Sequence, residues 1–363
     1  MNQARFGVGI IGLEPGRSWA AAAHLPALQA LPNDFTVAGV ANSSPESSAR
    51  AAAATGLRAF ASVDELVASP DVDIVAVTVK VPHHLALVSA AIAAGKHVYC
   101  EWPLGNGLAE GRELAALAKA RGVLGVVGTQ APFAPEVERL RELLGQGYVG
   151  EVLSTTLVGT GLKWGTEIEP YNAYILDRRM GATMLSIPVG HTLAALISAL
   201  GPFASVSATL LNRRHSSRNT ETGATVPMTA HDQVLFSGVL ESGAAISVHY
   251  RGGTARGDGL LWEINGAQGD LKITGPGGHS QMMPLFLHGG RGDDASLAPI
   301  AVKADPDGGV VGNVRRVYAA MASDLRTGTR LAPSFDQAVD LHRTIEAIER
   351  SAEQGRRVDL SEI

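Results

Sequence analysis

Short apolar runs alternate with helix-forming segments through the first third of the chain, and this alternation restricts the possible fold more than any other feature. The run at 73–81 consists almost entirely of β-branched and other apolar residues, which is typical of a strand buried on both faces. Shorter runs at 6–12 and 36–41 precede it, and an alanine-rich segment with helical propensity follows each of them. Strands and helices in this order form right-handed parallel βαβ units. We therefore predict an α/β domain over residues 1–129.

The pattern changes near residue 130, where longer strand-like runs follow one another with short glycine-containing turns between them, as in antiparallel hairpins. We predict strands at 152–159, 204–211, 233–240, 244–250, 260–265 and 270–274. The stretch 275–312 is rich in glycine, proline and aspartate and is expected to form a surface excursion. Residues 130–363 are thus predicted to form an α+β domain with a large, mostly antiparallel open sheet and a helix at 191–200 on one face.

The composition excludes several classes of protein. Of the 363 residues, 45% are hydrophobic and 18% are charged, so the chain has enough apolar surface to build folded cores. The net charge of −5 provides no basic field for nucleic acid or anionic lipid, and no apolar run reaches the length of a membrane span. The single cysteine, Cys100, cannot form an internal disulfide, which suits a reducing compartment. We expect a cytoplasmic protein that contacts neither nucleic acid nor membrane.

A glycine turn follows the first predicted strand and precedes the first predicted helix. Gly12 and Gly16 match the common G-x-G-x-x-G pattern only in part, because Glu14 stands where the second glycine would be. Backbone N–H groups at such a turn, with the positive end of the helix, can hold the pyrophosphate of a dinucleotide. We expect Gly12, Glu14, Gly16, Arg17 and Trp19 to bind the cofactor. The alternatives are a turn without a ligand and a core role for Trp19.

The second predicted strand ends in Asn42, Ser43 and Ser44 rather than in an acid. A carboxylate at this place would bind the adenosine ribose and repel a 2′-phosphate, whereas small amide and hydroxyl side chains tolerate that phosphate. We expect all three residues to contact the cofactor, which is NAD or NADP with a slight preference for NADP. The alternative is that they form an ordinary polar turn.

The segment from Ala94 to Leu104 reads AGKHVYCEWPL. It resembles the A-G-K-H-V-x-x-E-K-P motif of the glucose–fructose oxidoreductase/inositol dehydrogenase (Gfo/Idh/MocA) family. Matches at Gly190–Thr192, Gly252–Gly253 and Gly269–Lys272 are nearest to the branch that contains the yeast galactose-regulon repressor. The resemblance implies an N-terminal Rossmann dinucleotide-binding domain, followed by an α/β domain for substrate binding and oligomerisation. It also implies a place at the cofactor for His84, Glu101, Trp102 and Pro103, with an ordinary histidine at a helix N-terminus as the alternative for His84.

Two of the three catalytic positions that the resemblance implies differ in this chain. Trp102 stands where most family enzymes have lysine, and an indole N–H is neither acid nor base near neutral pH. Ile187 stands in place of an aspartate, four residues before the family histidine, which is retained as His191. Imidazole can take the proton of a substrate hydroxyl, so His191 is the predicted catalytic residue, with a capping or core histidine as the alternative. Lys80, at the end of a buried strand, is a candidate for the missing lysine; its alternative is a solvated strand end.

Polar and aromatic side chains precede the helix of His191. Lys163, Trp164 and Tyr174 suit a sugar-like ligand, whose hydroxyls need hydrogen bonds and whose apolar ring face favours aromatic contact. With His191 they are the predicted substrate residues. His279 and His288 lack the spacing of metal ligands, so no metal site is expected.

Two functions from different classes are compatible with these residues. The first is an NAD(P)-dependent oxidoreductase that exchanges a hydride with a sugar, cyclitol or related polyol, and the retained His84 and His191 favour it. The second is a catalytically silent dinucleotide-sensing regulator that binds a partner protein, and Trp102 together with the family branch favours it. In both cases we expect a homodimer or homotetramer that forms through the open sheet.

Overall fold

The computed structural model describes residues 5–305 and 307–363, and the chain divides into two compact units. The first unit comprises residues up to 130 together with 307–340, and the second comprises 131–305 and 341–363. The chain first leaves the first unit after Gln130. It then returns to that unit with α8 (Gly309–Thr327), a segment that the sequence analysis assigned to the second domain.

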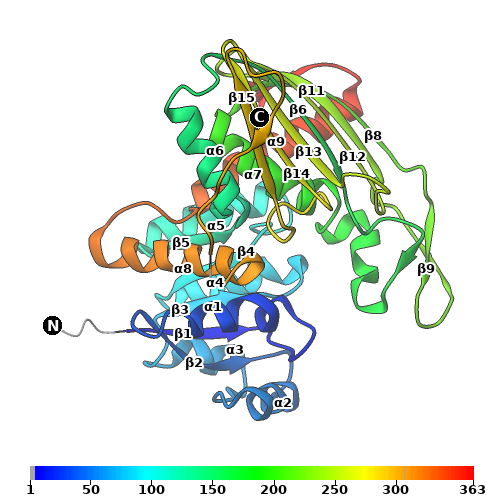
Figure 1. Ribbon diagram of the computed structural model, residues 1–363. Helices are drawn as coiled ribbons and strands as arrows, with labels where there is room; N and C mark the ends of the chain where they lie inside the picture. The colour runs from blue at the N-terminus through cyan, green and yellow to red at the C-terminus, as the bar shows by residue number, and fades with distance from the viewer. Residues whose placement is uncertain (1–4, 306) are drawn as a thin grey trace. The chain divides into compact units, whose positions relative to one another are not determined.

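A five-stranded parallel sheet forms the centre of the described part of the first unit (Figure 1). Its strand order is β2-β1-β3-β4-β5, so the predicted Rossmann-type arrangement is confirmed. All four residues of β3 are buried, as the continuous apolar run predicted. The strands are β1 (Phe6–Ile11), β2 (Phe35–Ala41), β3 (Ile74–Val77), β4 (His97–Glu101) and β5 (Gly125–Gly128).

Helices connect these strands, and capping residues explain where α2 begins and ends. Ser44 caps α2 by accepting the N–H of Ser47, and Gly56 ends the helix in a left-handed conformation. The first predicted helix, which follows the run at 6–12, is formed by a π-helical turn, Ala20–His24, and then α1. The other helices of this unit are α3 (Val63–Ala68), α4 (His84–Ala93) and α5 (Leu108–Arg121), with α1 at Leu25–Gln29 and α2 at Pro45–Thr55.

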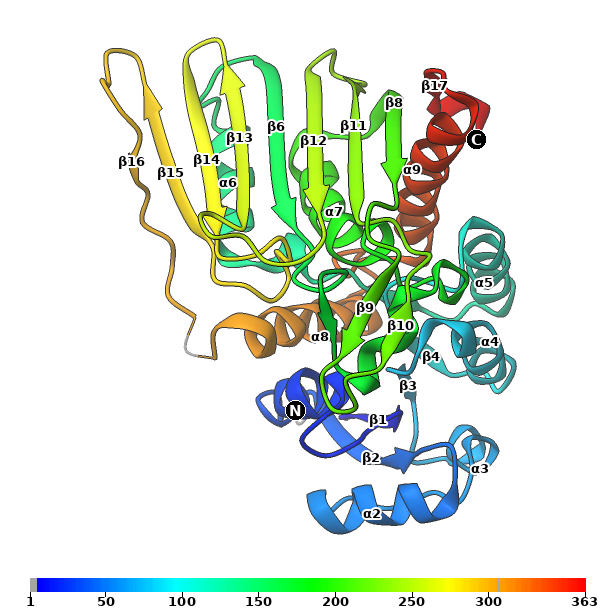
Figure 2. The same ribbon diagram turned by 90° about the vertical axis from the view of Figure 1, so that its right-hand side faces the viewer.

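The described part of the second unit contains a nine-stranded sheet in the order β16-β15-β14-β13-β6-β12-β11-β8-β17 (Figure 2). Only β6 and β12 pair in parallel within it, so the prediction of a large, mostly antiparallel sheet is confirmed. The strands are β6 (Val152–Thr160), β8 (Phe203–Leu211), β11 (Gln233–Leu240), β12 (Ala245–Arg251), β13 (Leu260–Gly266), β14 (Gly269–Gly275), β15 (Phe286–Arg291), β16 (Ala298–Pro299) and β17 (Val358–Asp359).

Helices α6 (Pro135–Gly145) and α7 (Gly190–Leu200) lie against one face of this sheet (Figure 2). Trp262 on β13 and Tyr250 on β12 are buried in the core beneath them. On the other face, Val158 of β6 is 41% exposed and pairs in register with Leu261 of β13. Helix α9 (Phe335–Gln354) contains the third boundary between the units, after residue 340. Among the described residues, no helix is long and apolar enough to cross a membrane.

Part of the stretch 275–312 is not the surface excursion that its composition indicated. Strand β15 pairs with β14 over six residues and continues the sheet. A Cβ at Gly289 would lie 2.6 Å from Ile300 and 2.9 Å from Leu271, so close packing requires the glycine that made the segment look like a loop. A small sheet of β7 (Glu167–Ile168), β9 (Ser216–Asn219) and β10 (Thr225–Pro227) was also not predicted.

Candidate functional site

The carboxyl ends of the five parallel strands lie along one edge of the first unit's sheet, because all of the strands run in the same direction. In open α/β sheets, ligands bind outside this edge, where neighbouring connections leave in opposite directions. The predicted cofactor residues in this unit all follow a strand end. They come after β1 (Gly12–Trp19), β2 (Asn42–Ser44), β3 (Lys80, His84) and β4 (Trp102, Pro103), with Glu101 as the last residue of β4.

The two glycines of the turn after β1 have different roles. Gly12 has φ +100°, and a Cβ on it would lie 2.6 Å from Cγ1 of Val79 and 3.1 Å from the carbonyl oxygen of Thr78. Gly12 is therefore needed for packing against the end of β3. Gly16 has φ +72° and no atom within 4 Å of its Cβ position, so its backbone faces open space. Of the two, Gly16 offers the closer backbone approach to a ligand.

The segment after this turn fits an anionic group. The Ser18 hydroxyl accepts the N–H groups of Glu14 and Ala21, which orders the start of the helical segment. The indole N–H of Trp19 is buried and has no acceptor among the described residues. A buried donor without an acceptor destabilises a protein unless water or a ligand supplies one. The residues present thus fit the pyrophosphate of a dinucleotide, with Gly16 and Trp19 as its nearest candidates.

The side chains at the end of β2 are partly used within the protein. Asn42 donates to the carbonyl oxygens of Leu13, at 2.9 Å, and Ser47, at 3.1 Å. Ser44 is the cap of α2, as the polar-turn alternative implies. Ser43 is exposed, as are Arg17 and Glu14. This edge carries no carboxylate among residues 42–44, and Ser43 is the residue there that faces solvent.

His84 does not have the free imidazole that a direct contact with nicotinamide requires. Its Nδ1 lies 2.8 Å from the carbonyl oxygen of Pro103, and its Nε2 lies 2.9 Å from that of Val79. Only 1% of the residue is exposed, and this burial lowers its pKa. His84 instead joins the loops that follow β3 and β4. Lys80 is exposed and precedes the short helix Val81–His83, as expected for a solvated strand end.

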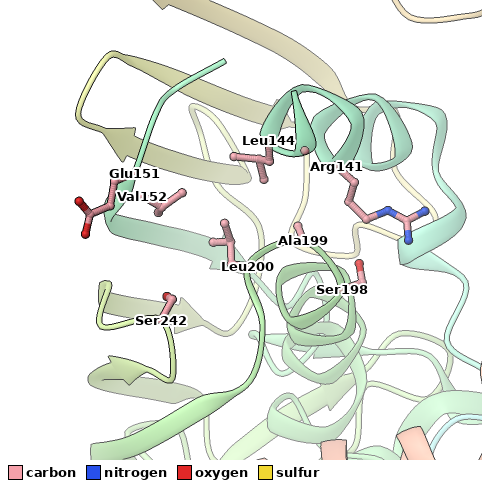
Figure 3. Close-up of a pocket in the computed structure, with 9 residues that line it drawn as sticks. Arg141, Leu144, Glu151, Val152, Ser198, Ala199, Leu200 and Ser242 are labelled. Carbon is pink, nitrogen blue, oxygen red and sulfur yellow. The ribbon is translucent and has the colours of Figure 1, made fainter. Parts of the chain in front are cut away.

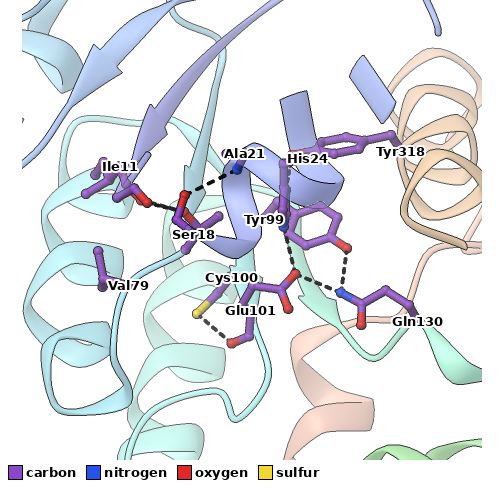
Figure 4. A network of polar contacts seen from close by, with 12 residues as sticks. Ile11, Ser18, Ala21, His24, Val79, Tyr99, Cys100, Glu101, Gln130 and Tyr318 are labelled. Atoms are coloured by element: carbon purple, nitrogen blue, oxygen red, sulfur yellow. Dashed lines mark hydrogen bonds and ion pairs between the residues drawn. The ribbon is translucent and has the colours of Figure 1, made fainter. Parts of the chain in front are cut away.

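Glu101 lies at the centre of a polar network that the sequence analysis did not anticipate (Figure 4). Its Oε1 accepts hydrogen bonds from Nε2 of His24, at 2.8 Å, and from Nε2 of Gln130, at 2.7 Å. The following Trp102 is 4% exposed, and the peptide bond between Trp102 and Pro103 is cis. No sequence pattern pointed to His24 or Gln130, because their relation to Glu101 arises only from the packing of separate elements.

His191 is a buried polar residue of the second unit. It is the second residue of α7 and is 4% exposed, and its Nδ1 has no hydrogen-bond partner among the described residues. Burial, and then the charge of His279, lower the pKa of His191 to about 3. The ring is therefore neutral near pH 7 and can accept or donate a hydrogen bond. Ile187 lies in the π-helical turn Leu185–Val189 that precedes α7, so no carboxylate orients the imidazole from that position.

His279 belongs to the same buried region, although its sequence context suggested only a glycine-rich loop. Its Nε2 donates to the carbonyl oxygen of Gly161 at 2.8 Å, and burial lowers its pKa to about 4. The hydroxyl of Thr192, next to His191, lies 3.0 Å from the hydroxyl of Ser280, next to His279. The sequence analysis considered His279 only as a metal ligand and missed this arrangement, which no local signal indicates.

The predicted substrate residues have three different environments. Trp164 is 1% exposed, and its indole N–H donates to the carbonyl oxygen of Ile175, so it is a core residue. Lys163 pairs with Glu169 at 2.5 Å and remains partly exposed. Tyr174 is half-buried, and burial raises its pKa to about 12. The structure thus assigns Trp164 to packing and leaves Lys163 and Tyr174 accessible.

This segment also contains backbone strain. Leu162 and Trp164 have φ values of +60° and +55°, which non-glycine residues rarely adopt. A Cβ at Gly252 would lie 2.2 Å from the carbonyl oxygen of Trp164, so the predicted Gly252–Gly253 pair permits close packing here. Strained backbone of this kind is frequent at functional sites.

A pocket of about 410 Å³ in the second unit contains none of the predicted site residues. It lies at the ends of α6 and α7, where Leu144, Leu200 and Glu151 surround it and the guanidinium of Arg141 points away (Figure 3). Elsewhere in the described chain, no group of three or more histidine, cysteine, aspartate or glutamate side chains could hold a metal ion.

Comparisons with known proteins agree with this architecture. Residues 6–129 match the model of an oxidoreductase family with an NAD-binding Rossmann fold, and residues 135–275 match that of the Gal80p C-terminal domain. The chain is 27% identical to the galactose/lactose metabolism regulatory protein GAL80 of Saccharomyces cerevisiae, over 100% of this chain and 96% of that protein. It is 31% identical to the dehydrogenase aclE of Aspergillus oryzae, over 90% of this chain and 89% of that protein.

A solved structure shows the same similarity in three dimensions. A super-repressor mutant of Gal80p from Saccharomyces cerevisiae superimposes with a TM-score of 0.90 and 25% sequence identity, covering 99% of this chain and 98% of that one. The fold is therefore shared with both regulators and dehydrogenases.

Proposed function

We propose that this chain, which belongs to the Gfo/Idh/MocA oxidoreductase family, is an NAD(P)-dependent enzyme that transfers a hydride between nicotinamide and a sugar, cyclitol or related polyol. The observation that carries the proposal is the hydrogen bonding of the buried His191 imidazole. A purely structural buried histidine normally has partners for its ring nitrogens. Nδ1 of His191 has none among the described residues, which supports a ligand as its partner.

The bound dinucleotide would supply the carbon that accepts or donates the hydride. Residues of the first unit would hold it: Gly16 and Trp19 at the pyrophosphate, and Glu101 through its carboxylate. In the oxidation direction, His191 takes the proton of the substrate hydroxyl while the carbinol carbon loses its hydride, and a carbonyl results. Because the pKa of His191 is lowered to about 3, the ring is in the proton-accepting form at all physiological pH values.

The same lowered pKa makes His191 a weak base, so proton transfer from a resting alcohol is unfavourable. The transfer becomes favourable as the hydride leaves, because the hydroxyl of the developing carbonyl is far more acidic than that of an alcohol. Trp102 and Ile187 can add no acid or base to this step. Lys80 remains a second candidate for the proton step.

We also propose that the protein is a cytoplasmic homodimer or homotetramer in which the open sheet face contacts a second copy. A mostly apolar row crosses this face in register through Phe286, Thr274, Leu261, Val158, His249 and Leu235, and four of these six residues are apolar. Phe286 is 55% exposed and Val158 is 41% exposed. Apolar side chains that are exposed to water along such a row favour association with a second copy of the chain.

The second candidate function is a dinucleotide-sensing regulator that binds a partner protein. The similarity to the regulatory protein GAL80 over the full chain favours it, as do Trp102 and Ile187 at two catalytic positions of the family. In this case the dinucleotide would control the affinity for the partner, and no hydride would move.

A screen of dehydrogenase activity separates the two functions. The purified protein is incubated with NAD+ or NADP+ and a panel of sugars, cyclitols and polyols, and the reduced cofactor is measured at 340 nm. The enzyme proposal predicts turnover with at least one member of the panel. Because residues 42–44 include no carboxylate to repel a 2′-phosphate, we also expect NADP+ to be used at least as well as NAD+. Dinucleotide binding without turnover in either direction would support the regulator.

A further inference from the structure

A buried chain of polar contacts links strand β4 to helix α8 within the first unit. Nε2 of His24 lies 2.8 Å from Oε1 of Glu101, and Nδ1 of the same ring lies 2.8 Å from the hydroxyl of Tyr318. His24 and Tyr318 have no exposed surface, and Glu101 has a side-chain exposure of 13% (Figure 4). Three segments that are far apart in the sequence therefore meet at the last residue of β4.

One assignment of protons satisfies this chain of contacts with a neutral imidazole. An ionised carboxylate can only accept, so Nε2 of His24 carries the proton and donates it to Glu101. Nδ1 then accepts from the Tyr318 hydroxyl. Burial, with the nearby charge of Glu101, raises the pKa of Tyr318 well above its usual value, so the hydroxyl retains its proton as a donor.

Gln130 restrains the same carboxylate oxygen. Its Nε2 donates to Oε1 of Glu101 at 2.7 Å, and the opposite orientation of the amide would set two acceptor oxygens against each other. A Cβ at Gly128 would lie 2.5 Å from Oε1, so backbone also closes this side. Both donors are thus directed at Oε1, and Oε2 of Glu101 accepts no hydrogen bond from the described residues (Figure 4).

A second acceptor beside this carboxylate also lacks a partner. The Oε1 atom of Gln130 is buried and has no donor among the described residues. Gln130 follows the end of β5, and Glu101 ends β4, so both belong to the ligand-binding edge of the sheet. The buried Oε1 of Gln130 lacks a donor, and Oε2 of the partly exposed Glu101 side chain is accessible beside it, so this edge suits a ligand that presents N–H or O–H groups.

The path of the chain at His24 is unusual as well. Ala20–His24 is a π-helical turn, and its buried residues, Ala20, Ala23 and His24, form its inward side. Such turns are rare and are frequently found at functional sites, because they redirect side chains relative to an α-helix. Here the turn directs an imidazole towards the end of β4.

We propose that His24 and Tyr318 are positioning residues that hold Glu101 so that its Oε2 accepts a hydrogen bond from the nicotinamide riboside half of a bound dinucleotide. This inference rests on the proposed dinucleotide function. The strand order selects that half: the pyrophosphate is expected at the end of β1 and the adenosine at β2, whereas β3 and β4 lie on the other side of β1. Ribose hydroxyls and a carboxamide NH2 are donors of the required kind.

The test compares two probes by titration calorimetry. NADH or NADPH, whichever the wild-type protein binds more tightly, carries the nicotinamide riboside; ADP carries only the adenosine and two phosphates. We expect His24→Leu to weaken binding of the full dinucleotide roughly tenfold or more, because a hydrogen bond to a charged group is lost, and to leave ADP affinity unchanged. Glu101→Gln should have a similar effect. Tyr318→Phe, which removes one hydroxyl, should have a smaller effect in the same direction.

Two further variants separate positioning from general damage to the fold. His24→Gln keeps an amide N–H near the place of Nε2 and should retain most of the affinity. His97→Leu removes a histidine at the opposite end of β4, where Nδ1 accepts the N–H of Leu124, and should change neither affinity.

The outcomes are distinguishable. If wild-type protein binds neither probe, the proposed dinucleotide function is wrong. If it binds both, but His24→Leu and Glu101→Gln leave dinucleotide affinity unchanged, the positioning role is wrong and the dinucleotide function stands. Equal weakening of both probes, with no recovery in His24→Gln, would reduce His24 to a structural residue and also overturn the inference.

Discussion

The hydroxyl of Thr192 lies 3.0 Å from the hydroxyl of Ser280 and 3.3 Å from the carbonyl oxygen of Gly278. His191 precedes Thr192, and His279 lies between Gly278 and Ser280. These hydrogen bonds therefore join the two segments that contain the buried histidines. Tyr250 supports the same junction through its hydroxyl, which donates to Thr192. The imidazole proposed for proton transfer is therefore held by its neighbours rather than by a carboxylate.

Replacement of His191 tests its catalytic role. His191→Ala should retain dinucleotide binding and lose turnover roughly a hundredfold or more, as removal of a general base does. The measurement is kcat with the best substrate of the screen, together with the dinucleotide Kd. His215→Ala replaces an exposed histidine of the second unit that lies outside both the predicted site and the open sheet face, and it should leave kcat unchanged. An active His191→Ala variant would reject this assignment and make Lys80 the next residue to replace.

The buried histidines should make the protein less stable in mild acid. Burial lowers the pKa of His191 to about 3 and that of His279 to about 4, so in the folded state both stay neutral when the unfolded chain begins to take up protons near pH 6.5. The unfolded state then binds more protons, and the free energy of unfolding falls as pH decreases from 6.5 towards 4. Each group contributes up to about 1.4 kcal/mol per pH unit in this range.

Denaturant unfolding at pH 7.0 and pH 5.5 measures this effect. The variant His279→Gln should lose less stability between the two pH values than the wild-type protein, by about 1 kcal/mol. Turnover at saturating substrate should not follow the protonation of a free histidine near pH 6.5, because His191 is already neutral there. An equal loss of stability in both proteins would show that His279 is not protonated preferentially in the unfolded state.

The two turn glycines should respond differently to alanine. Both have positive φ, which costs about 1 kcal/mol or more for alanine, but only at Gly12 would the Cβ also lie 2.6 Å from Val79. Gly12→Ala is therefore expected to lower the melting temperature more than Gly16→Ala. Calorimetric titration of the folded variants should show the larger loss of dinucleotide affinity at Gly16. The reverse order of the two affinities would place the pyrophosphate elsewhere on the turn.

A charge on the open sheet face tests the proposed assembly. Val158→Asp puts a carboxylate in the middle of the apolar row, between Leu261 and His249 in register, and should convert the oligomer to monomer. Val158→Thr keeps the shape and the β-propensity and should weaken assembly much less. Light scattering at micromolar concentration gives the mass of each. A monomeric wild-type protein, or an unchanged oligomer in Val158→Asp, would contradict the proposal.

The predicted strands of both units are confirmed where hydrophobic periodicity was clear. Strand β3 is apolar throughout because it is covered on both faces. Strand β12 buries every second residue, and β13 does so from Leu260 to Ile264. Strand β15 was missed because Gly289 and Gly290 give it the composition of a loop; the lack of side chains that hides it in the sequence is what lets Ile300 and Leu271 pack there.

The site residues also fall into two groups, those that a local sequence pattern marks and those that only tertiary packing brings together. Gly12, Gly16, Glu101 and His191 could be selected from the sequence, because a turn, a motif and a family position mark them locally. Their partners could not: His24, Gln130, Tyr318 and His279 come from separate segments, and only packing decides that they meet Glu101 or lie in the region of His191.

By itself, the sequence determined the class of each domain, the order of the strands along the chain and the residue types available for chemistry, since these depend on short-range periodicity and composition. The tertiary structure alone decided that α8 returns to the first unit, that Trp164 is core, that both nitrogens of His84 face carbonyl oxygens, and that Nδ1 of His191 is left without a partner among the described residues. Each of these depends on contacts between residues distant in sequence. Burial and hydrogen bonding are properties of those contacts, and no local pattern encodes them.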